Sequence, residues 1–208
     1  MDWQDRLVAA ADQALRTLVG PTQASRPSPA ADLSDSLFTA EERRTSSALM
    51  RVNHAGEIAA QALYSGQSVM ARSAMTRDHL LQAAAEEQDH LAWCAQRIAE
   101  LDGRRSLLDP LWYAGSFLLG MLAGSAGDRV SLGFIAETER QVEAHIRDHL
   151  LRLPHTDAKS AAILKRMATD EAHHGTTAML SGGMELPQPV RSLMALGGEF
   201  LRRTALWV

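Results

Sequence analysis

The chain has 208 residues, 46% of them hydrophobic and 22% charged, which suits one folded domain with a real core and excludes global disorder. The formal net charge is −4 and the basic residues form no dense cluster, which argues against a nucleic-acid partner. The single cysteine, Cys94, excludes an intrachain disulfide and any metal site that needs four cysteines.

An N-terminal segment, residues 1–38, is expected to form a short helix and a linker. Apolar residues from Trp3 to Leu18 recur at helical spacing, which predicts an amphipathic helix over 2–18. Residues 20–36 are rich in Pro, Ser and Ala and are typical of a linker. The start of the chain is acidic and has no apolar signal core, so we expect a reducing, cytoplasm-facing location.

Four long helices are predicted in the rest of the chain. Thr39 and Glu42 form a capping-box pattern at the start of the first. No alternation of β-branched and aromatic residues predicts a strand, so a helical bundle is the expected architecture. The predicted helices span residues 39–72, 77–101, 128–152 and 156–180.

Two apolar stretches lie outside these four helices. Residues 110–127, within a crossover at about 107–127, form an uncharged run that is barely long enough to cross a bilayer. A crossing there would separate the two halves of the bundle. We therefore expect this run to lie on a membrane surface, or else to be an ordinary buried helix. The C-terminal segment, about 189–208, is expected to be amphipathic.

Two Glu-x-x-His pairs indicate metal binding. Glu87 and His90 are three residues apart, as are Glu171 and His174, and such residues share one face of a helix. Each pair can therefore bind one metal ion. Either pair alone would more often be a solvated helix face.

Two further glutamates strengthen the metal interpretation. Glu57 precedes Glu87 by 30 residues and Glu139 precedes Glu171 by 32, which places each at the level of a Glu-x-x-His pair in an antiparallel hairpin. The flanking residues at helical spacing are apolar, so the carboxylates should point into the bundle core. These flanking residues are Met50, Ala60, Tyr64, Ile135, Ala136, Val142, Ile146, Leu164, Met167 and Ala178.

Four carboxylates and two imidazoles in an apolar core would be costly without a counter-charge. Two divalent ions would balance the four negative charges. One Glu from each of two helices and a Glu-x-x-His from each of the other two is the ligand pattern of ferritin-like di-iron proteins. The predicted fold class is therefore all-α, a ferritin-like four-helix bundle over residues 39–208, with an apolar crossover helix and extra terminal helices. Such ligands favour iron or manganese over zinc.

Supporting residues are less clearly indicated. Glu86 and Asp170 precede the two ligand glutamates and would either orient the imidazoles or be exposed helix charges. His54, one turn before Glu57, and His145, six residues after Glu139, are further candidates for support of the site.

Six motifs in order over about residues 40–208 make the chain similar to a known family, the ubiquinone-biosynthesis di-iron hydroxylases, or 3-demethoxyubiquinol 3-hydroxylases. The resemblance implies the metal ligands Glu57, Glu87, His90, Glu139, Glu171 and His174, and adds His145 as a supporting residue. Asn53 departs from the family, in which many members have Asp. The motifs are RVNHAGE (51–57), YSGQ (64–67), EEQDHL (86–91), PLW (110–112), ETERQVEAH (137–145) and DEAHHG (170–175).

The resemblance also implies an activity. Two iron ions per chain would use dioxygen to hydroxylate the ring of a polyprenylated methoxy-benzoquinol, demethoxyubiquinol, and the second oxygen atom would leave as water. The polyprenyl tail would lie along the apolar crossover. The protein would bind peripherally to the cytoplasmic face of the bacterial inner membrane. The sequence leaves open the prenyl length, the electron donor, the oligomeric state and whether a lipid-presenting partner protein delivers the substrate.

Three alternatives remain at this point. A ferritin-like iron-binding protein or ferroxidase would have the same ligands, but no exposed apolar crossover. A hydroxylase of another substrate, such as modified tRNA, would need a basic groove. A metal-free bundle with charged faces would bind no iron at all.

Overall fold

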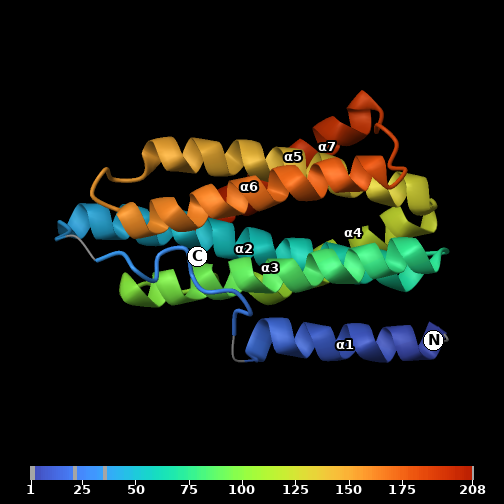
Figure 1. Ribbon diagram of the computed structural model, residues 1–208, viewed down its shortest axis with the longest axis horizontal. Helices are drawn as coiled ribbons and strands as arrows, with labels where there is room; N and C mark the ends of the chain where they lie inside the picture. The colour runs from blue at the N-terminus through green and yellow to red at the C-terminus, as the bar shows by residue number, and fades with distance from the viewer. Residues whose placement is uncertain (1–2, 21–22, 35–36, 208) are drawn as a thin grey trace.

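The computed structural model describes residues 3–20, 23–34 and 37–207. Four long helices form an antiparallel bundle in which α2 packs beside α3 and α5 beside α6 (Figure 1). The described residues contain no strand. The predicted all-α, ferritin-like bundle is thereby confirmed. The bundle helices are α2 (Ala40–Met70), α3 (Ala74–Glu100), α5 (Asp128–Arg152) and α6 (Ala158–Leu180).

Polar side chains at the helix starts explain the boundaries. The predicted capping box at Thr39 is present, because the backbone N–H of Glu42 donates to its hydroxyl at 3.2 Å and Thr39 N–H donates to the Glu42 carboxylate at 2.8 Å. The predicted start of α3 at residue 77 was wrong. The Ser73 hydroxyl accepts from Thr76 N–H at 3.0 Å, so the helix begins three residues earlier, at Ala74.

In each bundle helix, the glutamate that the sequence indicates as a metal ligand has an apolar residue seven positions before it and another seven positions after it. Seven residues are about two helical turns, so the three side chains lie on one face. The flanking residues belong to two separate apolar clusters, one at each end of the bundle. The four glutamates therefore form a polar layer between two apolar layers. The triplets are Met50–Glu57–Tyr64, Leu80–Glu87–Cys94, Leu132–Glu139–Ile146 and Leu164–Glu171–Ala178.

The crossover between the two hairpins contains helix α4 (Asp109–Ser125), which packs along α2. The two backbones touch at glycines. A Cβ atom on Gly66 would lie 2.2 Å from the carbonyl oxygen of Phe117, and one on Gly120 would lie 2.2 Å from that of Leu63. Only residues without a side chain permit so close an approach.

Two terminal helices complete the fold. Helix α1 (Trp3–Val19) packs against α2, and α7 (Gln188–Trp207) packs across α2 and α5. Both agree with the predicted terminal helices. Of the predicted linker, residues 21, 22, 35 and 36 lie outside the described residues, and residues 23–34 lie against the bundle without a regular helix.

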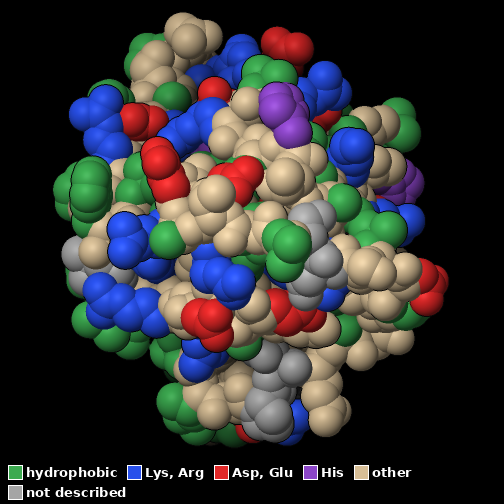
Figure 2. Space-filling model, turned by 90° about the vertical axis from the view of Figure 1, so that its left-hand side faces the viewer, with side chains coloured by type: hydrophobic (Ala, Val, Ile, Leu, Met, Phe, Trp, Pro, Cys, Tyr) green, Lys and Arg blue, Asp and Glu red, His purple; other side chains and the backbone are tan. Residues whose placement is uncertain are grey.

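Apolar side chains are exposed along α4 and α7. Among the helices that the structure describes, none has the length and hydropathy to cross a membrane. By contrast, the end of the bundle that faces the viewer in Figure 2 shows basic, acidic and apolar side chains mixed together. The exposed apolar residues of the two helices are Leu111, Leu118, Leu119, Leu122, Val190, Leu193, Leu196, Phe200 and Trp207.

Candidate metal centre

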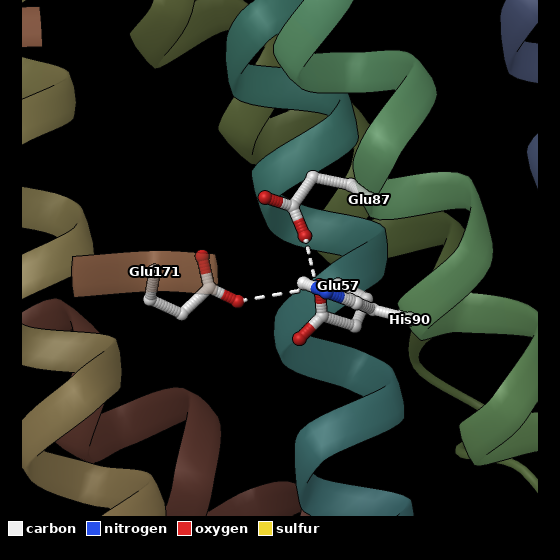
Figure 3. A group of neighbouring side chains, drawn as sticks. All are labelled: Glu57, Glu87, His90 and Glu171. Carbon is white, nitrogen blue, oxygen red and sulfur yellow. Dashed lines mark hydrogen bonds and ion pairs between the residues drawn. The ribbon is translucent and has the colours of Figure 1, made fainter. Parts of the chain in front are cut away.

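The polar layer contains two overlapping groups of side chains. In the first, Glu57 from α2, Glu87 and His90 from α3 and Glu171 from α6 converge on one point (Figure 3). The His90 Nδ1 atom lies 2.8 Å from a Glu87 oxygen and 3.2 Å from a Glu171 oxygen. The third carboxylate, that of Glu57, lies 3.8 Å from the same nitrogen. One donor atom from each of the four lies within 4.8 Å of the others.

The second group mirrors the first. Glu139 from α5 and His174 from α6 join Glu87 and Glu171, again with donor atoms within 4.8 Å of one another. The His174 Nδ1 atom lies 3.1 Å from Glu87 and 3.3 Å from Glu171. Glu87 and Glu171 thus belong to both groups, whereas Glu57 and Glu139 each belong to one. The structure brings together all six residues that the sequence indicates.

The two imidazoles are oriented by acids on the opposite helix. His90 on α3 directs its Nε2 atom at Asp170 on α6, at 3.0 Å. His174 on α6 directs its Nε2 atom at Glu86 on α3, at 2.7 Å. The Nδ1 atom of each ring is therefore left facing the glutamates. An acid that holds one ring nitrogen fixes the orientation of a ligand imidazole, so the predicted orienting contacts are present, and each crosses to the other hairpin.

Burial dominates the electrostatics of the layer. Removal from water, and then the charge of Glu87, raise the pKa of Glu57 well above its usual range. Burial and the charge of Glu171 do the same to the pKa of Glu139. For His174, burial alone would lower the pKa, but the hydrogen bonds that its ring donates to Glu171 and Glu87 outweigh burial and raise the pKa to about 12. Without metal the layer therefore stores protons, and a metal ion would have to displace them.

The residues fit a pair of divalent ions. Within the described part of the chain, the buried Oε1 atom of Glu139 accepts no hydrogen bond. A buried carboxylate oxygen without a donor is costly unless a cation faces it. Four carboxylates and two neutral imidazoles would balance two divalent ions, and carboxylate-rich donors suit iron or manganese.

The other candidates lie apart from the two groups. His54 is buried and its Nδ1 atom lies 3.5 Å from Asp109, at the start of α4. Asn53 donates to the backbone carbonyl of Leu49 at 2.8 Å and pairs with His149 Nδ1 at 3.0 Å. His145 packs edge-on against the same His149, with ring centroids 3.9 Å apart. A supporting role for His145 stays a prediction.

Sequence reasoning missed one side chain next to the layer. Arg26 comes from the predicted linker, yet its Nη1 atom donates to Asp170 at 2.9 Å. Nothing in the linker's composition or periodicity indicates this contact. The only signal was a charged residue within an otherwise Pro-, Ser- and Ala-rich stretch.

The chain matches a known family over most of its length. The family model described as ubiquinone biosynthesis protein COQ7 matches residues 44–205. A relative from Nitrosomonas europaea, named 3-demethoxyubiquinol 3-hydroxylase, is 54% identical over 204 residues, which are 98% of each chain. Relatives of the same name from Legionella pneumophila (strain Lens) and Xanthomonas oryzae pv. oryzae (strain PXO99A) are 52% and 54% identical, and cover 98% and 97% of this chain and 97% and 93% of their own. The buried layer of glutamates and histidines in a helical bundle is thus the centre of a member of the COQ7 family.

Proposed function

We propose that the protein is a 3-demethoxyubiquinol 3-hydroxylase, a monooxygenase that adds one hydroxyl group to a polyprenylated benzoquinol ring. The observation that carries the proposal is the pair of Glu/His groups that share Glu87 and Glu171. Membership of the COQ7 family, and three relatives named 3-demethoxyubiquinol 3-hydroxylase, support the choice of substrate.

The six residues would hold two iron ions. Glu87 and Glu171, which belong to both groups, would help to hold both ions, and Glu57 and Glu139 would each help to hold one. His90 and His174 would each bind one ion through Nδ1. When bound, the iron pair supplies the reduction and activation of dioxygen that the hydroxylation requires.

Other residues of the chain would orient the two imidazole ligands and exclude water from the site. Glu86 and Asp170 hold the Nε2 protons of the two imidazoles, so both rings keep one tautomer and one orientation. The apolar layers on both sides exclude bulk water. Exclusion of water keeps the oxidant for the substrate and strengthens every electrostatic interaction inside.

Labelled oxygen tests the proposal directly. The protein would be reconstituted anaerobically with ferrous iron, given a demethoxyubiquinol analogue and a chemical reductant, and exposed to ¹⁸O₂. We expect mass spectrometry to find one ¹⁸O atom on the ring, and none without iron or with Glu171→Ala. Iron that is oxidised without ring labelling, at a rate independent of the quinol, would instead favour the ferroxidase alternative.

We also propose that the exposed apolar surface of α4 and α7 rests on a membrane and takes the polyprenyl tail, at the cytoplasmic face of the bacterial inner membrane. Leu118 and Leu119 on α4 are 61% and 45% exposed, and Phe200 on α7 is 62% exposed. Phe200 also packs edge-on against Trp112 of α4, which joins the two helices into one surface. Amphipathic helices of this kind bind the interface through their buried apolar area.

Vesicle flotation tests the membrane surface. The double variant L118D/L119D should lose its affinity for phospholipid vesicles, because two charges would have to enter the apolar interface. A matched control is L151D/L180D, which changes two leucines that are 85% and 84% exposed on α5 and α6. Equal flotation of both double variants would contradict the assignment of this surface.

A further inference from the structure

The segment before the bundle is fastened beside the metal centre. Ser25 donates to Asp89 on α3 from its backbone N–H at 2.6 Å and from its hydroxyl at 3.0 Å. The next residue, Arg26, pairs with the same buried carboxylate through Nε. These residues precede the range that the family model matches, 44–205.

Arg26 bridges two helices of the centre. Its Nε atom contacts Asp89 on α3 and its Nη1 atom donates to Asp170 on α6 at 2.9 Å. A guanidinium group is a planar fork of fixed donors, so one arginine can hold two carboxylates in a defined geometry. The fork itself is fixed, because it stacks over the Trp93 ring at 4.9 Å.

Asp170 connects Arg26 to His90 of the polar layer. The oxygen of Asp170 that accepts from Arg26, Oδ2, is also the one that lies 3.0 Å from His90 Nε2. Arg166, one turn earlier on α6, contacts both oxygens of Asp170, at 3.1 Å and 3.0 Å. The carboxylate that orients His90 is therefore held from its own helix by one arginine and from the N-terminal segment by another.

The corresponding acid in the other half has weaker support. Apart from its contact with His174, the carboxylate of Glu86 accepts one side-chain hydrogen bond, from Gln82 at 3.2 Å, and it is 38% exposed. The contacts with Asp89 alone would be enough to attach residues 23–34 to the bundle. The Nη1 atom of Arg26 makes an additional contact with Asp170, the acid that orients His90.

We propose that Arg26 is a positioning residue of the metal centre: it fixes Asp170, which fixes the ring of His90 and with it the metal ion that this ring binds. The inference rests on the proposed two-metal site. It extends the functional unit of the protein to the N-terminal segment.

Titration with Co²⁺ tests the proposal without turnover, since its d–d absorption reports the ligand geometry. In the wild-type protein we expect two Co²⁺ ions per chain. R26M should weaken one of the two by about tenfold or more and change its d–d band, since loss of such an outer contact typically lowers metal affinity 10- to 100-fold. R26K keeps the charge but not the fork, so it should fold and recover part of the affinity, with the altered band retained.

The control variant is T17V. The Thr17 hydroxyl donates to Gln61 at 2.6 Å and fastens α1 to the bundle without a contact to Asp170. T17V should lower the free energy of unfolding and leave both Co²⁺ sites unchanged. The proposal would be overturned if R26M and R26K both showed the Co²⁺ affinities and d–d bands of the wild-type protein. If R26M does not fold, the same result in R26K alone would overturn it. A T17V variant that reproduces the R26M spectrum would also overturn it. A wild-type protein that binds no pair of Co²⁺ ions would refute the two-metal site itself.

Discussion

The two hairpins of the bundle contribute the same ligands but hold them differently. His90, from the α2–α3 hairpin, is fully buried, and the acid that orients it, Asp170, is 10% exposed and contacts two arginines. His174, from the α5–α6 hairpin, faces Glu86, which is 38% exposed. Ligand symmetry therefore does not imply equal rigidity. We expect the position at His90 to bind its ion more tightly and the position at His174 to be the more adaptable one.

The largest effect should come from the shared ligands. Glu87→Ala or Glu171→Ala removes a carboxylate that belongs to both groups, so both metal ions should be lost. Glu57→Ala or Glu139→Ala removes a carboxylate from one group and should reduce the content to about one ion per chain. Elemental analysis after reconstitution gives the ratio of metal to protein. One retained ion in Glu171→Ala would show that this glutamate is not needed by both ions.

The acids behind the imidazoles test the asymmetry itself. Asp170→Asn should weaken metal binding 10- to 100-fold, whereas Glu86→Gln should cost only a few-fold, because an exposed acid is screened by water and its replacement is readily accommodated. Competition with a chromophoric chelator measures both affinities. Equal losses would mean that burial of the orienting acid does not distinguish the two positions.

Without metal the two halves should behave alike. Glu57→Gln and Glu139→Gln each remove a buried carboxyl group whose pKa is raised, first by burial and then by a neighbouring carboxylate. Each change should raise the free energy of unfolding of the metal-free protein at pH 7 by about 1–3 kcal/mol, because the wild-type carboxyl group must either take up a proton on folding or be buried as a charge. Urea unfolding with a chelator present measures the effect. Destabilisation by either variant would contradict the raised pKa of that carboxyl group.

The smallest expected effect is on the pH dependence of stability, and it involves the contact between Asn53 and His149, which joins the two hairpins away from the metal centre. Burial first, and the charge of Arg152 second, lower the pKa of His149 to about 4. Between about pH 4 and 6.5 the unfolded chain binds more protons than the folded one. The contribution of His149 to the free energy of unfolding therefore increases as the pH rises through this window and is lost as the pH falls through it. Asn53→Asp would place a carboxylate where Asn53 now pairs with the ring, at 3.0 Å.

We expect this substitution to raise the pKa of His149 by about one unit or more, which would flatten the pH dependence of stability in that window. An NMR titration of the His149 ring measures the pKa. An unchanged pKa of His149 would show that the new carboxylate turns away from the ring.

The sequence was sufficient to predict the six residues of the layer, because their identity depends on spacing along single helices. Glu87 and His90 share a face in any straight helix, and the spacing of Glu57 and Glu87 follows from one short turn. The pairing of Glu86 with His174, and of Asp170 with His90, depends on how α3 is rotated against α6. Spacing along the sequence suggested that these acids orient imidazoles, but it could not predict which acid faces which imidazole.

Arg26 was beyond sequence reasoning for a different reason. It lies in a segment without periodicity, and the two carboxylates that it contacts belong to residues 63 and 144 positions away in the sequence. Placement of such a side chain is decided by its tertiary contacts alone. The start of α3 was predicted three residues late because Ser73 was not recognised as its cap.

The close approach of α4 to α2 at Gly66 and Gly120 sets a mechanical limit on the crossover. At these two glycines backbone lies directly on backbone, so no side-chain rotation there could loosen the contact. Helix α4 is then a fixed wall and not a hinged lid. Under the proposed function, the polyprenylated substrate would therefore have to reach the buried layer without displacing α4 from α2 at these two glycines.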